Sequence, residues 1–323
     1  MERENKAVQY KWFAVYLFYP GELDLILREL VAPFIREFFP DEQTDAQYFF
    51  IRYWENGSHI RLRMNVEHAL HKVLAKALEQ RAKDFFSQYP AVGILKDAIN
   101  NPVNQFVCQS VTQSVNQPVD QDLLTDHAVQ FSVYEPEIIR YGNKQSLVWA
   151  ERHFFKSSIF ILDWICTKKP GASALIQALR LHLILLLATG WEIPRLITVC
   201  EFFIDGWLPR LYISGTDMAA QKIFWLKEFE TSFNRTKAII LPASKVFWEE
   251  LTTETANQKV QDLLKTNILI LQNYQQAGFK ETKFTEIMTS LMHMNNNRLG
   301  ISNYEEAYGM YCTLRCLDFI ANS

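Results

Sequence analysis

The sequence predicts an α+β fold in which a ferredoxin-like sheet region, residues 1–142, precedes an all-helical region, residues 143–323. The first observation behind this prediction is the order strand, helix, strand, strand, helix, strand in the first region, which is the ferredoxin-like pattern. The second observation is a series of long stretches with helical apolar spacing after residue 142. With 323 residues, the chain has room for two compact units or for one large mixed domain with an ample core.

The first strand and the first helix are predicted at residues 9–18 and 22–39. The strand "QYKWFAVYLF" is rich in aromatic and β-branched residues and stops at a turn signal, Pro20 and Gly21. Large apolar residues then recur at helical spacing, namely Leu23, Leu27, Leu30, Phe34 and Phe38. Because proline lacks a backbone N–H and clashes with the preceding turn, Pro33 is expected to kink this helix or to start a second piece.

The second helix and the fourth strand are predicted on either side of a polar segment. Apolar residues repeat at helical spacing through residues 67–88, namely Leu70, Leu74, Leu78, Ala82 and Phe85. Residues 128–135 alternate between apolar and polar side chains, as a half-buried strand does. Residues 99–122 lie between the two and are dominated by Asn, Gln, Ser and Pro, which predicts a long surface loop.

The helical region shows its last helix junction in the sequence. Gly300 is expected to end one helix, and Ser302 with Glu305 forms a capping box that starts the next. The longest apolar tract, residues 178–191, contains an arginine and a histidine and is too short to span a membrane. We therefore expect a buried helix there.

The composition is that of an ordinary globular protein: 49% of the residues are apolar, 21% are charged, and the formal net charge is −3. This balance gives no bulk attraction to nucleic acid. The five cysteines are scattered and form no C-x-x-C pair, so we expect them to be reduced. The charged N-terminus lacks the apolar stretch of a secretory signal. We expect a cytoplasmic protein with no metal and no cofactor.

The segment "YFFIRYWENGSHIRLRM", residues 48–64, is predicted to form a hairpin. Asn56 and Gly57 suit a two-residue type I′ turn because both tolerate positive φ, and this register places Arg52 opposite Arg61. Strand alternation then predicts two faces. The face expected to pack against the helices comprises Phe49, Ile51, Tyr53, Ile60, Leu62 and Met64. The other face comprises Phe50, Arg52, Trp54, His59, Arg61 and Arg63.

The predicted pairing of Arg52 with Arg61 costs stability unless an anion or an acid relieves it, since like charges directly opposite each other across two strands repel. Two interpretations of this basic face stay open. The arginines are either solvated or held by internal ion pairs with glutamates, or they dock a carboxylate or phosphate. The planar guanidinium group binds such oxyanions through two parallel hydrogen bonds.

Four segments, in order from about Tyr10 to the end of the chain, resemble one family. The stretch "FFIRYWENGSHIRLRM" resembles the start of the C-terminal domain of lantibiotic dehydratases, a domain also found as stand-alone thiopeptide-type bacteriocin biosynthesis proteins. The segments "GELDLILRELVAPFIREF", "YEPEIIRYG" and "SLMHMNNNRLG" resemble three further parts of that domain. Family members usually have two glycines after the Arg-Tyr pair, whereas here Gly142 is followed by Asn143. This departure affects the turn more than the chemistry.

The resemblance implies an elimination enzyme. Its substrate would be a ribosomally made precursor peptide whose Ser or Thr has been glutamylated by a separate transfer-RNA-dependent dehydratase subunit, and its product would be dehydroalanine or dehydrobutyrine. The implied catalytic residues are Arg61, Arg63, Arg140 and His293. We further expect Arg52, His59, Tyr141 and Arg298 to bind the substrate, although the resemblance does not itself assign them. A homodimer is also implied, with no direct binding of nucleic acid or membrane.

These residue types suit an elimination, which needs a base for the Cα proton, hydrogen-bond donors for the enolate and cations for the leaving carboxylate. Each also has a structural alternative. His293 could bond a backbone carbonyl at a helix end, and Arg298 could complement a helix dipole. Arg140 could form an ion pair with Glu135 or Glu137.

Two other functions stay open. Relatives of this fold also perform the cycloaddition that closes the pyridine ring of thiopeptides. Alternatively, the protein is a non-catalytic subunit that binds the precursor peptide for its partner. Convergence of the four implied catalytic residues on one pocket would favour catalysis over binding alone.

Overall fold

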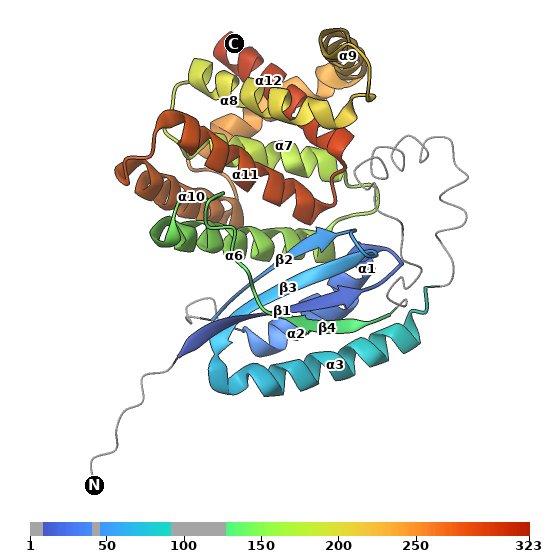
Figure 1. Cartoon of the computed structure of the whole chain (residues 1–323). Helices are drawn as coiled ribbons and strands as arrows, with labels where there is room; N and C mark the ends of the chain where they lie inside the picture. The colour runs from blue at the N-terminus through green and yellow to red at the C-terminus, as the bar shows by residue number, and fades with distance from the viewer. Residues whose placement is uncertain (1–8, 41–45, 92–126) are drawn as a thin grey trace. The chain divides into compact units, whose positions relative to one another are not determined.

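The computed structural model describes residues 9–40, 46–91 and 127–323, and the polar segment at residues 99–122 lies outside them (Figure 1). The chain divides into two compact units. The first unit comprises Met1–Pro136 and Ile161–Lys168, and the second comprises Glu137–Phe160 and Lys169–Ser323.

The first unit holds a four-stranded antiparallel sheet in the order β2-β3-β1-β4 (Figure 1). Its strands are β1 (Tyr10–Phe18), β2 (Gln47–Tyr53), β3 (His59–Glu67) and β4 (Val129–Ser132). Its helices are α1 (Leu23–Ile26), α2 (Ala32–Phe38) and α3 (His71–Gln88). Figure 1 shows these three helices on one side of the sheet. Along the described chain the order is β1, α1 and α2, β2, β3, α3, β4.

The first predicted helix is interrupted near Pro33, as expected. A π-helical turn, Leu27–Val31, separates α1 from α2, and Pro33 lies in the first turn of α2. Proline is tolerated there because the N–H groups of a first helical turn have no partner within the helix. The wider turn before it removes the clash that a continuous α-helix would impose.

The hairpin between β2 and β3 pairs one residue away from the predicted register, so the predicted register is wrong. Tyr53 pairs with His59, and the loop runs over residues 54–58. Asn56 and Gly57 do adopt positive φ, at 61° and 111°, but within this longer loop. One shifted residue moves every side chain of one strand to the opposite face.

The corrected register separates Arg52 from Arg61 and Arg63. The face that packs against the helices carries Tyr48, Phe50, Arg52, Ile60, Leu62 and Met64. The opposite face carries Phe49, Ile51, Tyr53, His59, Arg61 and Arg63. The predicted faces are therefore right for β3 and wrong for β2, and the repulsion expected between Arg52 and Arg61 does not arise.

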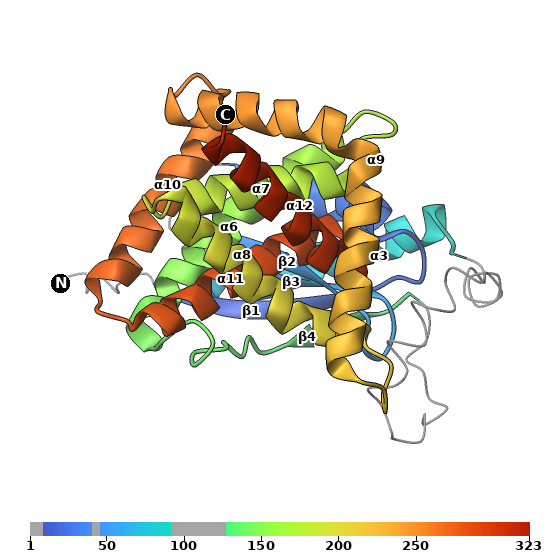
Figure 2. The same ribbon diagram turned by 90° about the horizontal axis from the view of Figure 1, so that it is seen from above.

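The second unit is helical. It contains α7 (Ala174–Leu187), α8 (Ile193–Trp207), α9 (Met218–Thr252), α10 (Gln258–Gln276), α11 (Glu281–Leu299) and α12 (Asn303–Ala321), with a short 3₁₀ turn at Leu208–Leu211. Helix α6 (Lys144–Thr167) begins in this unit and contributes its last residues to the first. Figure 2 shows that α9 changes direction along its length, and Pro242 in its interior explains the bend.

The predicted helix junction near the C-terminus is confirmed. Gly300 adopts a left-handed φ of 79° after α11, and Ser302 and Glu305 form a reciprocal capping box at the start of α12. The predicted buried helix is α7, which contacts α9, α10, α11 and α12 and is buried along most of its length. No helix among the described residues is long and apolar enough to cross a membrane.

Candidate functional site

Two groups of candidate residues are present, one in each unit. The first is the arginine face, the sheet face opposite the helices of the first unit. It combines two arginines and a histidine with aromatic rings, namely Trp12, Tyr16, Phe18, Phe49, Tyr53, His59, Arg61 and Arg63. The alternation of each strand brings these side chains to one surface because antiparallel partners directly opposite each other share a face.

Arg61 is held by two rings and a histidine. Its guanidinium carbon lies 3.4 Å from the ring centroid of Tyr53 and 4.7 Å from that of Tyr16. Its Nε donates to Nε2 of His59 at 3.0 Å, while Nδ1 of His59 lies 2.8 Å from the carbonyl oxygen of Gly57. Nδ1 therefore carries the proton and Nε2 accepts. Burial lowers the pKa of His59, which favours this neutral ring.

Arg63 and Arg52 lie in different surroundings. Arg63 lies between two aromatic rings, with its guanidinium carbon 5.3 Å from the centroid of Phe49 and 5.1 Å from that of Tyr134. Arg52 is 5% exposed on the opposite face and forms an ion pair with Asp24 of α1. Arg52 therefore has an internal carboxylate partner on the side of the sheet that faces the helices.

Asp24 is the centre of this buried charge cluster. It accepts from Arg52 and also from Lys168, the last residue of the first unit. Burial by itself would raise the pKa of the Asp24 carboxyl, but these two cations outweigh it and hold the pKa below its usual value.

The second group is the His293 cluster, which comprises Arg140, Trp207, Arg210, Ser290, His293 and Glu306 of the second unit. Nδ1 of His293 lies 3.0 Å from both carboxylate oxygens of Glu306. Because a carboxylate only accepts, Nδ1 carries the proton and Nε2 of a neutral ring keeps its lone pair. The side chain of Glu306 is 3% exposed and that of His293 is 21% exposed, so solvent reaches the imidazole but not its carboxylate partner.

Two arginines, Arg140 and Arg210, interact electrostatically with Glu306. Arg140 donates from Nε to Ser290 Oγ at 3.2 Å, one helical turn before His293, and from Nη1 to Glu137 at 2.9 Å. Burial opposes the charge of Arg140, but Tyr141, Glu137 and Glu306 together raise its pKa.

Arg210 was not singled out by the sequence analysis. Its guanidinium carbon lies 3.8 Å from the ring centroid of Trp207, whose ring is 4.6 Å from that of His293. Burial lowers the pKa of Arg210, and Arg140 acts in the same direction, whereas Glu306 opposes it. Glu306 was missed as well, although an acid one position after a capping-box glutamate, on the first turn of an apolar helix, was a usable signal.

Tyr141 and Arg298 lie inside the second unit. Tyr141 is 3% exposed and its ring meets that of Phe154 edge-on at 5.1 Å. Arg298 is fully buried, donates to the carbonyl of Met294 at 3.0 Å and lies 5.1 Å from the Phe154 ring centroid. These contacts make both residues part of the interior. Neither residue is among the described contacts of His293.

The Arg-Tyr-Gly segment ends in a tight turn. Gly142 has a φ of 106°, and a Cβ at this position would lie 2.6 Å from the ring of Phe279. Asn143, which replaces the second glycine of the family pattern, accepts from the backbone N–H of Gln145 and Ser146 and so caps α6. The replacement of that glycine by Asn143 therefore acts on the turn, where it supplies a helix cap.

The four implied catalytic residues divide between the units. Arg61 and Arg63 belong to the first unit, and Arg140 and His293 belong to the second. Within the second unit, the structure brings Arg140 and His293 together around Ser290 and Glu306. Convergence of all four on one pocket stays a prediction.

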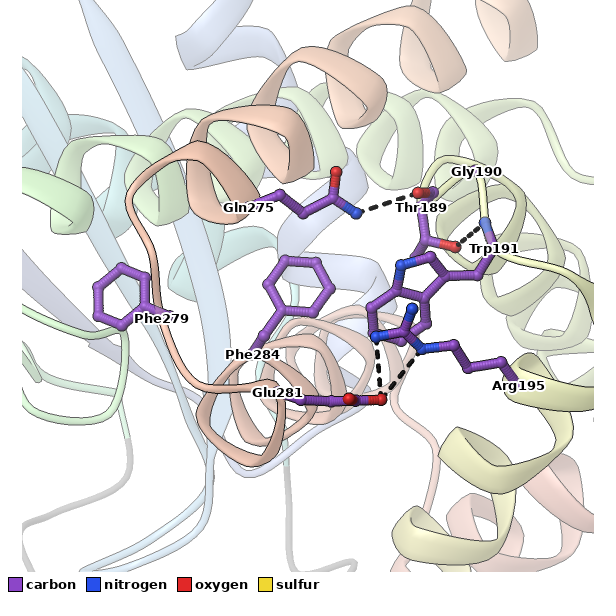
Figure 3. A pocket seen from close by; sticks show the side chains of 8 residues that line it. All are labelled: Thr189, Gly190, Trp191, Arg195, Gln275, Phe279, Glu281 and Phe284. Carbon is purple, nitrogen blue, oxygen red and sulfur yellow. Dashed lines mark hydrogen bonds and ion pairs between the residues drawn. The ribbon is translucent and has the colours of Figure 1, made fainter.

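A separate cavity of about 430 Å³ lies in the second unit (Figure 3). It is lined by Thr189, Gly190, Trp191, Arg195, Gln275, Phe279, Glu281 and Phe284, none of which the sequence analysis singled out. Arg195 stacks 3.5 Å above the ring centroid of Trp191 and bonds Glu281 through Nε and Nη2, at 3.0 and 2.9 Å. Its cation is therefore already neutralised. Among the described residues, no His, Cys, Asp and Glu side chains are grouped to hold a metal ion.

A comparison with protein families identifies the class of protein to which this chain belongs. The profile of the lantibiotic biosynthesis dehydratase C-terminal family matches residues 12–317. The chain therefore belongs to that family. No curated protein matches the chain.

Solved structures share the fold. The pyridine synthase TbtD from thiomuracin biosynthesis matches with a TM-score of 0.70 at 15% identity, over 97% of this chain and 98% of that one. TsrL matches with a TM-score of 0.62 at 12% identity, over 98% and 96%. The tRNA-dependent lantibiotic dehydratase MibB from Microbispora sp. 107891 matches with a TM-score of 0.56 at 17% identity. This match covers 97% of this chain but only 28% of MibB.

Proposed function

We propose that this protein modifies a ribosomally made precursor peptide by eliminating glutamate from glutamylated Ser or Thr, which leaves dehydroalanine or dehydrobutyrine. The observation that carries the proposal is the His293 cluster, in which a buried carboxylate orients a reachable histidine beside two arginines. Membership of the lantibiotic dehydratase C-terminal family supports the class of substrate.

The proposed reaction uses Nε2 of His293 as the base. It takes the Cα proton of the glutamylated residue, the electron pair forms the Cα–Cβ double bond, and the Cβ–O bond breaks. The negative charge leaves on the ester carboxylate, so glutamate departs as an anion and the proton stays on His293 until solvent removes it. Glu306 stabilises the imidazolium that forms, because it already accepts from Nδ1.

The arginines would stabilise the charge that leaves. Arg140 and Arg210 supply fixed cations next to His293, where partial burial strengthens their action on an anion. We propose that Arg61 and Arg63 of the first unit bind the carboxylates of the glutamyl group. Their stacking on aromatic rings holds the planar guanidinium groups in place, so little side-chain entropy is lost on binding.

The remaining predicted site residues receive supporting functions in this proposal. His59 orients Arg61. Arg52, Tyr141 and Arg298 stabilise the two units from inside, because each is buried among internal contacts. We also infer that the first unit is ferredoxin-like, since its element order and its strand order both suit that pattern.

The proposed partners are the precursor peptide and a separate enzyme that glutamylates it with transfer RNA. A second candidate function is the ring-closing reaction, which is favoured by the match of this chain to nearly the full length of a pyridine synthase. At 15% identity that match establishes the fold only. A peptide-binding subunit is the third candidate, and self-association of the chain stays a prediction.

The test is an elimination assay on a synthetic peptide that carries one glutamylated serine, followed by mass spectrometry. Wild-type protein should release glutamate and leave dehydroalanine. His293→Gln and Arg140→Gln should stall at the ester, because one lacks the base and the other a cation. Arg195→Gln is the matched control, since Arg195 also pairs with a glutamate and stacks on a ring but lies at the separate cavity.

Each other candidate function has its own outcome in this assay. An ester that persists with wild-type protein, while the peptide binds measurably, contradicts elimination. Ring closure of a peptide with two dehydroalanines would then establish the cyclase, and binding without any reaction would establish the subunit. A mass of the free protein by light scattering tests the homodimer.

A further inference from the structure

A buried chain of polar side chains leads from His293 into the interior of the second unit. Asn296 donates from Nδ2 to Oε2 of Glu306 at 3.2 Å, and its Oδ1 lies 3.0 Å from Nε2 of His182. Nδ1 of His182 lies 3.0 Å from Oγ1 of Thr313. We call Glu306, Asn296, His182 and Thr313 the polar chain, and each of them, taken as a whole residue, is at most 2% exposed.

The chemistry of these groups determines the direction of the hydrogen bonds from Glu306 through Asn296 to His182. Glu306 can only accept, so Asn296 must turn its Nδ2 toward it and its Oδ1 toward His182. That oxygen can only accept as well, so Nε2 of His182 must carry a proton. Burial lowers the pKa of His182 to about 4, so its ring is neutral near pH 7 and Nδ1 keeps its lone pair. The Thr313 hydroxyl has one proton and two acceptors in reach, this Nδ1 at 3.0 Å and the carbonyl oxygen of Gly309 at 2.9 Å.

The packing of three helices makes this arrangement possible. His182 comes from α7, Asn296 from α11, and Glu306 and Thr313 from α12, two helical turns apart on one face. Gly309 lies between those two on α12, and a Cβ there would approach Leu175 to 3.0 Å and Cε1 of His182 to 4.0 Å. The missing side chain therefore lets α12 approach α7 closely enough for the polar chain to close.

We propose that His182 and Asn296 are positioning residues for His293, and that through Glu306 they hold its ring with the proton on Nδ1 and the lone pair on Nε2. A buried carboxylate with one partner could rotate or take up a proton. The amide of Asn296 supplies a second donor, and His182 prevents that amide from turning over. This inference rests on the proposed function only where it assigns the lone pair to Cα proton removal.

The structure offers a matched control. Asn295 is the neighbour of Asn296 on α11, is 2% exposed where Asn296 is 0% exposed, and also bonds a buried histidine, His153, at 3.1 Å. It has no described bond to Glu306. Asn295→Leu and Asn296→Leu therefore remove the same amide from the same helix, and only the second cuts the polar chain.

The experiment reads the tautomer of His293 directly. In the full-length protein with ¹⁵N-labelled histidine, the resonances of His293 are assigned by their loss in His293→Gln. Wild-type protein and Asn295→Leu should show a protonated Nδ1, and Asn296→Leu and His182→Leu should show a mixture of tautomers. His182→Gln retains an N–H donor toward Asn296 and should retain the wild-type tautomer. Circular dichroism checks that each variant is folded.

Activity is measured on the same proteins. Cutting the polar chain should lower kcat about 10- to 100-fold with little change in KM, which is the loss typical of removing the outer partner of a metal-bound histidine. An unchanged tautomer in folded Asn296→Leu and His182→Leu overturns the inference, whatever the activity. A shifted tautomer in a protein that never releases glutamate supports the positioning by the polar chain and contradicts the proposed function.

Discussion

Removal of Asp24 should destabilise the first unit far more than removal of an exposed acid. The side chains of Arg52 and Asp24 are 6% and 12% exposed, so Asp24→Ala leaves a guanidinium group in the interior without this carboxylate. Breaking a buried ion pair in this way costs about 3–5 kcal/mol. Asp24→Ala also removes the partner of Lys168, but this adds little to the loss of stability, because Lys168 is 27% exposed and can turn toward water.

The assay is urea-induced unfolding, followed by tryptophan fluorescence and extrapolated to water. The matched control is Glu37→Ala, which removes the exposed partner of Arg81 and should cost about 0–1 kcal/mol. A double variant, Asp24→Leu with Arg52→Met, should recover most of the stability because it replaces both charges with apolar groups. Equal losses for Asp24→Ala and Glu37→Ala would refute the reasoning.

The pH dependence of this loss has a definite sign. The pKa of Asp24 is lower in the folded protein than its ordinary value, so its contribution is present above the unfolded pKa, about 3.9. That contribution is lost as the pH falls through the folded pKa. The difference in unfolding free energy between wild-type protein and Asp24→Ala should therefore be constant near neutral pH and shrink below about pH 4.

Three further predictions concern single positions. His59→Leu should lower the kcat/KM of elimination about tenfold by releasing Arg61, and His59→Gln, which keeps an acceptor, should lose less in the same steady-state assay. Gly142→Ala should lose about 2–3 kcal/mol in urea unfolding because strain and a clash combine. The control for Gly142 is Gly278→Ala, with φ of 73° and no atom within 4 Å, which should lose about 1 kcal/mol. Ser302→Ala should lose about 1 kcal/mol of capping, measured by thermal unfolding, and no measurable loss would contradict the capping box.

Local signals in the sequence predicted the elements well. The apolar spacing located the helices, Pro33 marked the break between α1 and α2, and Gly300 with Ser302 marked the last junction. These features depend on residues that are neighbours along the chain, so their physical causes act within a few positions.

The residues of the His293 cluster were predicted only in part. The resemblance named His293 and Arg140. Arg210 carried no motif, and Glu306 had only its place after the capping-box glutamate as a signal, so both were missed. Arg210 approaches the cluster through Trp207. Arg210 and Trp207 are only three residues apart, but Trp207 and His293 belong to helices that are distant along the chain, so no local pattern could reveal the contact between them.

By itself, the sequence determined which of the described segments are helix or strand, and that two arginines share one strand of a hairpin. Only the tertiary structure decided the hairpin register, the buried position of Arg52 against Asp24, and the polar chain from His182 to His293. The reason is physical: spacing within one element follows from backbone geometry. Contacts between elements depend on how side chains from distant segments fill a common interior.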